Sequence, residues 1–93
     1  MDIIWDDDKN KILQKSRAIS LEEIAQIILQ KKYLAVLENP SRLGQMIFVL
    51  DYKEYTHVVP FVLDSDNNIV LKTAFPSRKF HRLFGRGPNE NKT

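Results

Sequence analysis

The stretch ISLEEIAQIILQKKYLAVLE, residues 19–38, holds the change of hydrophobic period that decides the fold. Ser20 is followed three residues later by Glu23, which is a capping box, and Ile19 with Ile24 takes the two positions of a hydrophobic staple. A helix therefore begins at Ser20 and runs to about Lys31. Apolar residues recur along it at i, i+3, i+4 and i+7 and predict one buried face: Leu21, Ile24, Ala25 and Ile28.

From residue 33 the period falls to 2 or the apolar runs become continuous, and turn residues bound each run. This pattern predicts strands over residues 33–38, 46–52, 55–63 and 69–75. Their short connections favour an antiparallel meander. Pro60 lies inside the third of these strands, and because proline cannot donate to a ladder we expect a bulge or a strand break there.

The flanking segments complete the order of elements. Residues 2–5 predict a first strand, and Asp6 caps a helix over residues 7–17. Ser77 caps a short helix that runs to about Phe84. The order predicts an α+β domain in which two N-terminal helices pack on one face of an antiparallel sheet, with a short C-terminal helix. We expect one domain over residues 1–85 and a flexible tail over residues 86–93.

Composition narrows the class of protein. The chain has 93 residues, a formal net charge of +2 and 43% hydrophobic residues, which suits one small domain. The absence of Cys excludes disulfides, thiolate nucleophiles and zinc-thiolate sites. The start of the chain is acidic, and no apolar run approaches the roughly 18 residues that span a bilayer. We therefore expect a cytoplasmic protein that has no membrane partner.

The charges are segregated along the chain. Residues 1–8 carry four Asp and no basic residue, whereas residues 72–93 carry six Lys or Arg against a single Glu. A basic segment of this kind attracts phosphate backbones at long range, and it is equally typical of a solvated tail.

Four motifs spread over roughly residues 3 to 80 form a recognisable set. They are Trp5-Asp6-Asp7-Asp8-Lys9-Asn10, then Lys15, then Ile19-Ser20-Leu21-Glu22-Glu23, and finally Lys72-Thr73-Ala74-Phe75-Pro76-Ser77-Arg78-Lys79. Together they resemble the BrnT family of toxins from bacterial type II toxin-antitoxin pairs. The resemblance implies a RelE-like fold, a metal-independent ribonuclease that inhibits translation, and a ribbon-helix-helix antitoxin through which the pair binds operator DNA.

The chain also departs from the family pattern. Members commonly have a Lys-His-Gly step between the first two helices, where this chain has Lys15-Ser16-Arg17-Ala18. Lys72 stands where an arginine is often found, and the longer acidic C-terminal helix is replaced by Phe80-His81-Arg82-Leu83-Phe84. The resemblance is therefore to a divergent branch, and no role of the missing His carries over.

Metal-free RNA cleavage needs a group that takes the 2′-OH proton, a cation beside the phosphorane-like charge, and a donor for the leaving oxygen. Arg78 is the first choice for clamping a phosphate, since its planar fork matches two oxygens, although it equally suits an exposed surface position. Lys72 lies within an apolar strand, where a lysine either snorkels at an edge or sits in a functional groove. Lys79 is a further candidate for contact with RNA, and the alternative for it is a solvated surface position.

The two histidines are the natural acid and base candidates, because their unperturbed pKa lies near neutrality. His81 lies in the basic final helix, and the alternative for it is a plain surface residue. His57 shares a strand face with Tyr55, and such a histidine is often a half-buried structural residue. Arg82 and Tyr55 are the candidates for RNA contact, with a core position the alternative for the tyrosine.

No metal or cofactor is expected, because the N-terminal aspartates are explained by helix capping and no phosphate-binding glycine loop is present. Two functions remain open. The chain is a ribonuclease toxin, or it is a catalytically inactive module that binds an antitoxin and acts with it as a DNA-binding corepressor. Lys72 and Arg78 discriminate between them: convergence in one groove favours the enzyme, and separation favours the binding module.

Overall fold

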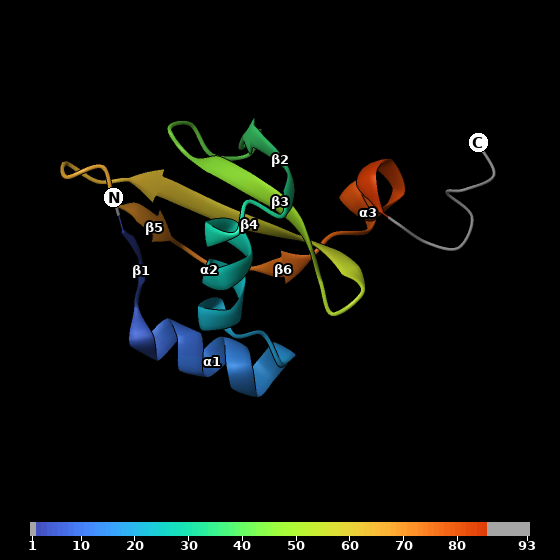
Figure 1. Cartoon of the computed structure of the whole chain (residues 1–93), viewed down its shortest axis with the longest axis horizontal. Coiled ribbons are helices and arrows are strands. Elements are labelled where there is room, and N and C mark those ends of the chain that lie inside the picture. Colours follow the sequence, from blue (N-terminus) through green and yellow to red (C-terminus); the bar gives the residue numbers. More distant parts are fainter. Residues whose placement is uncertain (1, 86–93) are drawn as a thin grey trace.

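The computed structural model describes residues 2–85, so the expected tail at residues 86–93 lies outside the described residues (Figure 1). Within them the α+β class is confirmed. The elements are β1 (Ile3–Trp5), α1 (Asp7–Arg17), α2 (Leu21–Leu29), β2 (Tyr33–Glu38), β3 (Met46–Tyr52), β4 (Tyr55–Leu63), β5 (Ile69–Leu71), β6 (Phe75–Pro76) and α3 (Arg78–Phe84).

The described strands form one sheet of order β1-β5-β4-β3-β2, and β6 pairs with β4 beside β5. The expected meander of β2, β3 and β4 is antiparallel, but β1 runs parallel to β5, with Ile3 opposite Ile69 and Trp5 opposite Leu71. The prediction of a purely antiparallel sheet was therefore wrong at this edge. A parallel pair needs a long crossover, and the chain from α1 to β4 supplies it.

Helices pack on both faces of the sheet, α1 and α2 on one face and the short α3 on part of the other, near one end of the strands (Figure 1). The larger core lies between α1, α2 and alternate residues of β3 and β4, and the smaller core lies beneath α3. The period of 2 in β3 sends Phe48 and Leu50 to the larger core and Ile47 and Val49 to the smaller one. The two N-terminal helices thus share a face, as the sequence predicts, and α3 occupies the other.

The start of α2 follows the predicted cap with one addition. Ser20 Oγ accepts from the backbone N–H of Glu23 at 3.3 Å. In an ordinary capping box the Glu side chain would bond the backbone N–H of Ser20 directly. Here Tyr52 stands between them, because its hydroxyl accepts from Ser20 N at 3.0 Å and donates to Glu23 Oε1 at 2.5 Å. The helix cap is therefore tied to β3.

The bulge or strand break expected at Pro60 is absent, because β4 continues through it in regular register with β3; the interruption lies in the neighbouring strand. Residues 69–75 were expected as one strand, but the structure divides them into β5 and β6 around residues 72–74. Pro60 itself stays within β4 opposite Ile47, and its carbonyl accepts from Lys72 N at 2.9 Å. The N and C=O of one strand residue point to the same neighbour, so the missing N–H faces the interrupted strand.

Three residues other than glycine adopt left-handed backbone at the end of the molecule where α1 meets the β3–β4 turn. They are Ala18 (φ 54), which ends α1, and the turn residues Lys53 (φ 53) and Glu54 (φ 67). Lys53 Nζ donates to the carbonyl of Ala18 at 2.6 Å and so joins the two bends. The left-handed conformation costs a residue with a Cβ about 1–2 kcal/mol.

Replacing the Tyr52 hydroxyl, which bonds both Ser20 N and Glu23 Oε1, should destabilise the fold. Tyr52→Phe keeps the packing but leaves the N–H of Ser20 without its partner, so we expect a loss of about 1–3 kcal/mol in the free energy of unfolding. Urea denaturation measures it, with Tyr33→Phe as the matched control. A loss of unfolding free energy no larger than that of Tyr33→Phe would show that the Tyr52 hydroxyl does not stabilise the helix cap.

Glycine at residue 18 should stabilise the fold. Ala18→Gly removes the steric cost of the left-handed conformation and adds unfolded-state entropy, leaving a net gain of about 0.5–1 kcal/mol. The control is Ala25→Gly, which lies inside α2 and should lose stability by a similar amount or more. Thermal or urea unfolding compares the two, and a loss at both positions would be the contrary result.

Candidate functional site

The short helix α3 presents the basic end of the described chain. Ser77 caps it as predicted, with Ser77 Oγ accepting from Phe80 N at 3.2 Å, and Ser77 N bonds the carbonyl of Thr56 at 3.0 Å. Phe80 and Phe84 pack against the smaller core and stack on each other. The polar side of the helix is left in solvent, where its exposed cations are Arg78, Lys79 and Arg82.

The ring of His81 is fixed against the start of β4. Its Nδ1 lies 3.0 Å from Thr56 Oγ1 and accepts from Thr56 N at 3.3 Å. The Thr56 hydroxyl in turn lies 3.2 Å from Asp51 Oδ1, as a donor to that carboxylate. The Tyr55 ring stacks on the imidazole, with centroids 4.0 Å apart and planes 16° from parallel.

This arrangement gives Nδ1 of His81 a hydrogen-bond partner whether or not that nitrogen carries a proton. A deprotonated Nδ1 accepts from the backbone N–H of Thr56. A protonated Nδ1 donates to Thr56 Oγ1, whose own hydrogen then goes to Asp51. Because Nδ1 is held in this way, Nε2 is the nitrogen available as an acid or a base. Among the described residues Nε2 has no hydrogen-bond partner.

Thr56 and Asp51 were missed in the sequence analysis. The two-residue connection between β3 and β4 places Tyr52 opposite Tyr55 and therefore Asp51 opposite Thr56, so the strand boundaries already contained that pair. The approach of His81 depends on how α3 packs back on the sheet, and no local pattern in the sequence reports it.

His57 lies on the opposite face of β4 from Thr56, in the layer of the N-terminal helices. It is 7% exposed, its Nδ1 lies 3.0 Å from the Tyr55 carbonyl, and the Tyr52 ring meets it edge-on at 5.2 Å. Burial lowers the pKa of His57, and the Tyr55 carbonyl opposes this in part. The structure therefore places His57 in the core and does not bring it to the surface occupied by His81.

Lys72 and Arg78 do not share a groove. The backbone of Lys72 bonds Pro60 O, and Ser77, which precedes Arg78, bonds Thr56 O. These anchors are four residues apart on β4, or about 13 Å at 3.3 Å per residue. The cavity that Lys72 lines does not include Arg78 among its lining residues.

Lys72 lines a different hollow, beside the interrupted strand. This cavity has a volume of about 330 Å³, and two further cations line it, Lys9 from α1 and Arg42 from the β2–β3 loop. None of its lining residues is Asp or Glu. Lys9 and Arg42 were not predicted, because three segments far apart in sequence supply these cations.

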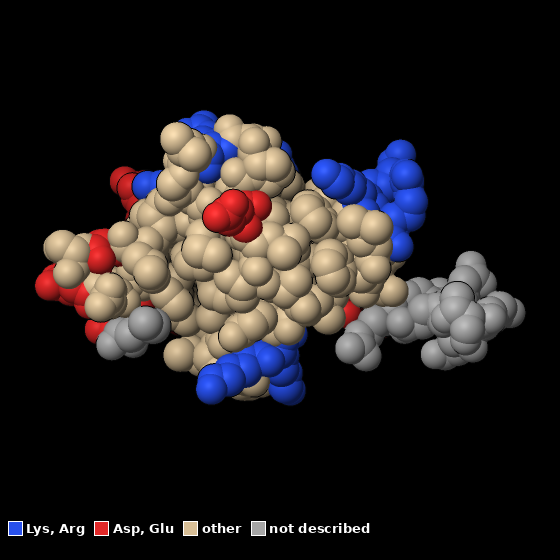
Figure 2. All heavy atoms as spheres, turned by 90° about the horizontal axis from the view of Figure 1, so that it is seen from above, with Lys and Arg blue, Asp and Glu red and all other residues tan. Residues whose placement is uncertain are grey.

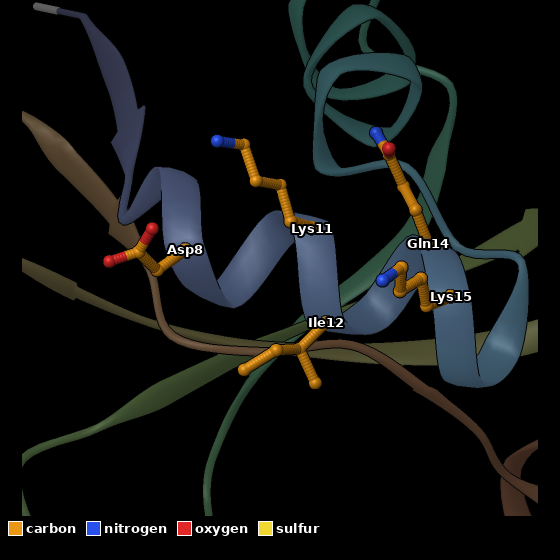
Figure 3. A pocket seen from close by; sticks show the side chains of 5 residues that line it. All are labelled: Asp8, Lys11, Ile12, Gln14 and Lys15. Atoms are coloured by element: carbon orange, nitrogen blue, oxygen red, sulfur yellow. The ribbon is translucent and has the colours of Figure 1, made fainter.

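A second hollow, of about 570 Å³, lies along the outer side of α1. Its lining residues are Asp8, Lys11, Ile12, Gln14 and Lys15, which Figure 3 shows pointing in different directions around the helix. With no point of convergence, these side chains do not form a binding site.

Charged side chains are unevenly spread over the surface. Figure 2 shows a group of Lys and Arg atoms at the end that carries α3 and several Asp and Glu atoms at the opposite end, with further charges of both signs between them. The acidic end includes the β4–β5 loop with Asp64 and Asp66. The exposed cations of α3 would attract an anionic group to the surface beside His81.

Within residues 2–85, no three His, Cys, Asp or Glu side chains are grouped in a way that would hold a metal ion. The described helices include none with the length and apolar character required to cross a membrane. Comparison with protein-family models, curated proteins and solved structures finds no match to this chain.

Burial of His57 predicts a pH-dependent stability. The pKa is near 6.5 in the unfolded chain and lower in the folded one, so between these values the unfolded chain binds a proton that the folded chain does not. This contribution is complete above pH 6.5 and is lost as the pH falls toward the lowered pKa, with a slope of at most about 1.4 kcal/mol per pH unit.

Urea unfolding from about pH 8 to 5 measures this slope. We expect His57→Gln to remove this part of the pH dependence and His81→Gln to retain it. An unchanged slope in His57→Gln would show that another group is responsible.

Proposed function

We propose that the protein is the toxin of a bacterial type II toxin-antitoxin pair, a cytoplasmic, metal-independent endoribonuclease that inhibits translation. The resemblance to BrnT toxins supplies the class. The observation that carries the proposal is the His81 imidazole, which is fixed at Nδ1 by Thr56, stacked on Tyr55 and flanked by the exposed cations of α3.

In the tautomer whose Nδ1–H donates to Thr56 Oγ1, His81 Nε2 is unprotonated and takes the proton of a ribose 2′-OH, and the 2′-oxygen attacks the adjacent phosphorus. Arg78 and Arg82 stabilise the added negative charge on the phosphate oxygens. The 5′-oxygen leaves with a proton from Lys79 or from water, which gives a 2′,3′-cyclic phosphate and a free 5′-OH. Tyr55 positions the imidazole, and His57 supports the Tyr55 carbonyl from the core.

Membership in this class of toxins also implies the binding partners of the chain. A ribbon-helix-helix antitoxin covers the basic end in the neutralised state, and an acidic antitoxin segment would match its charge. Operator DNA is then bound indirectly, through the antitoxin.

The second candidate is a catalytically inactive module that binds the antitoxin and serves as corepressor. The separation of Lys72 from Arg78 favours it, because the cations do not converge on one phosphate. In that case the α3 surface is a protein interface, and the half-buried His81 is one of its residues.

Expression of the chain without an antitoxin tests the two. We expect the wild type to arrest growth and leave RNA fragments that end in a 2′,3′-cyclic phosphate, and His81→Asn to cut purified RNA about 10²–10⁴-fold more slowly. Lys32→Ala, an exposed cation before β2, is the control and should behave as wild type.

Thr56→Val separates a positioning role from general instability. It keeps the shape of the residue and removes the hydroxyl between Asp51 and His81, so the pH profile of cleavage should shift while the fold, measured by circular dichroism, persists. Intact RNA under stable wild-type expression would disprove the nuclease and leave the corepressor.

A further inference from the structure

We propose that the cavity lined by Lys9, Arg42 and Lys72 is a second phosphate-binding site, which holds the backbone of single-stranded RNA apart from His81. Three elements converge there: the first turns of α1, the β2–β3 loop, and the segment between β5 and β6. The inference rests on the proposed action on RNA, but it does not require that the chain cut RNA.

The three cations are uncompensated. All are exposed, and within the described chain none of them forms an ion pair. Asn39, Ser41 and Thr73 add polar groups to the wall, and no lining residue carries a negative charge. Like charges that converge on one hollow repel each other, so an anion bound between them lowers the energy of the site.

The loop that carries Arg42 is already ordered. Asn39 Oδ1 accepts from Ser41 N at 2.9 Å, and the Asn39 backbone N–H bonds Gln45 O at 3.0 Å. Arg42 N bonds the carbonyl of Asn39, and Gln45 N bonds the carbonyl of Arg42. These bonds hold the base of the arginine side chain in place, so little backbone entropy is lost when it meets a phosphate.

The opposite wall exists because of Pro60. The residue is buried at the side of the cavity, facing the interrupted strand, and Lys72 to Thr73 bridge the interruption. Phe75 adds a half-buried aromatic ring to the lining. Cations interleaved with an aromatic ring are typical of grooves that bind single-stranded nucleic acid.

The shape favours a polymer over a single phosphate ion. A neighbouring hollow of about 600 Å³ shares Lys9, Thr73 and Phe75 with the cavity, adds the cation Arg17, and reaches Pro76. Pro76 lies at the end of β6, one residue before the cap of α3. The cations therefore lie along a track that leads from the β2–β3 loop toward the helix of His81.

An uncleavable probe tests the site independently of catalysis. A fluorescent uridine oligonucleotide with 2′-O-methyl riboses cannot be cut, because its 2′-oxygen carries no proton. Its binding to the full chain is followed by anisotropy over a range of salt concentrations. Each phosphate contact on a single strand contributes about −0.7 to the slope of log K against log salt.

The triple variant Lys9→Gln, Arg42→Gln, Lys72→Gln should lose about 2 from that slope and bind at least about tenfold more weakly. The matched control, Lys11→Gln, Lys31→Gln, Lys32→Gln, removes the same charge from exposed positions outside the cavity and should retain most of the slope. Equal losses in both variants, or none in the first, would overturn the proposal.

Inorganic phosphate is the competing ligand. If the cavity variant loses competition by phosphate but keeps its affinity for the oligonucleotide, the cavity holds a small anion and the RNA assignment is wrong. If the wild type binds the oligonucleotide through the cavity but never cuts unmodified RNA, the nuclease fails and this site stands. If a cavity variant keeps both the cleavage rate and the RNA affinity of the wild type, the nuclease stands and the proposed cavity site is wrong.

Discussion

The Tyr52 hydroxyl joins the helical layer to the sheet, and the arrangement of both layers depends on it. It accepts from the first N–H of the α2 cap and donates to Glu23, while its ring lies within the larger core. Burial and the bond to Glu23 raise the pKa of this phenol, so the hydroxyl keeps its proton well into the alkaline range. Asn10 of α1 adds a second tie, since its Oδ1 accepts from Leu21 N at 2.8 Å. Together these bonds satisfy backbone donors that a buried helix start would otherwise leave unpaired, at a cost of about 1–3 kcal/mol each.

A single proline links the local chemistry of the sheet to its surface. Pro60 stays in β4 and directs its missing N–H toward the strand beside it, which divides into β5 and β6. The segment between β5 and β6 carries Lys72, which lines the same cavity as Lys9 and Arg42. The backbone anchors of Lys72 and of Ser77, which precedes Arg78, lie four residues apart on β4. The basic residues therefore form two separate groups, one at the cavity and one on α3.

The two places differ in what they can do to a phosphodiester. The His81 end has an imidazole whose Nδ1 finds a hydrogen-bond partner with or without a proton on that nitrogen, which suits a group that gives and takes a proton at Nε2. The cavity has cations and amides without an acid or base, which suits holding a backbone. Under the function proposed above, an RNA strand that lay along both would be held at one end and exposed to chemistry at the other. If His81 does no chemistry, the same two surfaces would act in binding alone.

The sequence by itself determined the elements. The capping box at Ser20, the change of period after residue 32 and the cap at Ser77 place the helices and the strands β2, β3 and β4, because these signals are local interactions between near neighbours. It also indicated His81, Tyr55 and Arg78 as residues of interest. The tertiary structure alone decided that β1 lies parallel to β5, that His57 is buried, that Asp51 and Thr56 hold His81, and that Lys9 and Arg42 meet Lys72. Each of these depends on contacts between segments far apart in the chain, and the free energy that selects them comes from packing, which no short window of sequence contains.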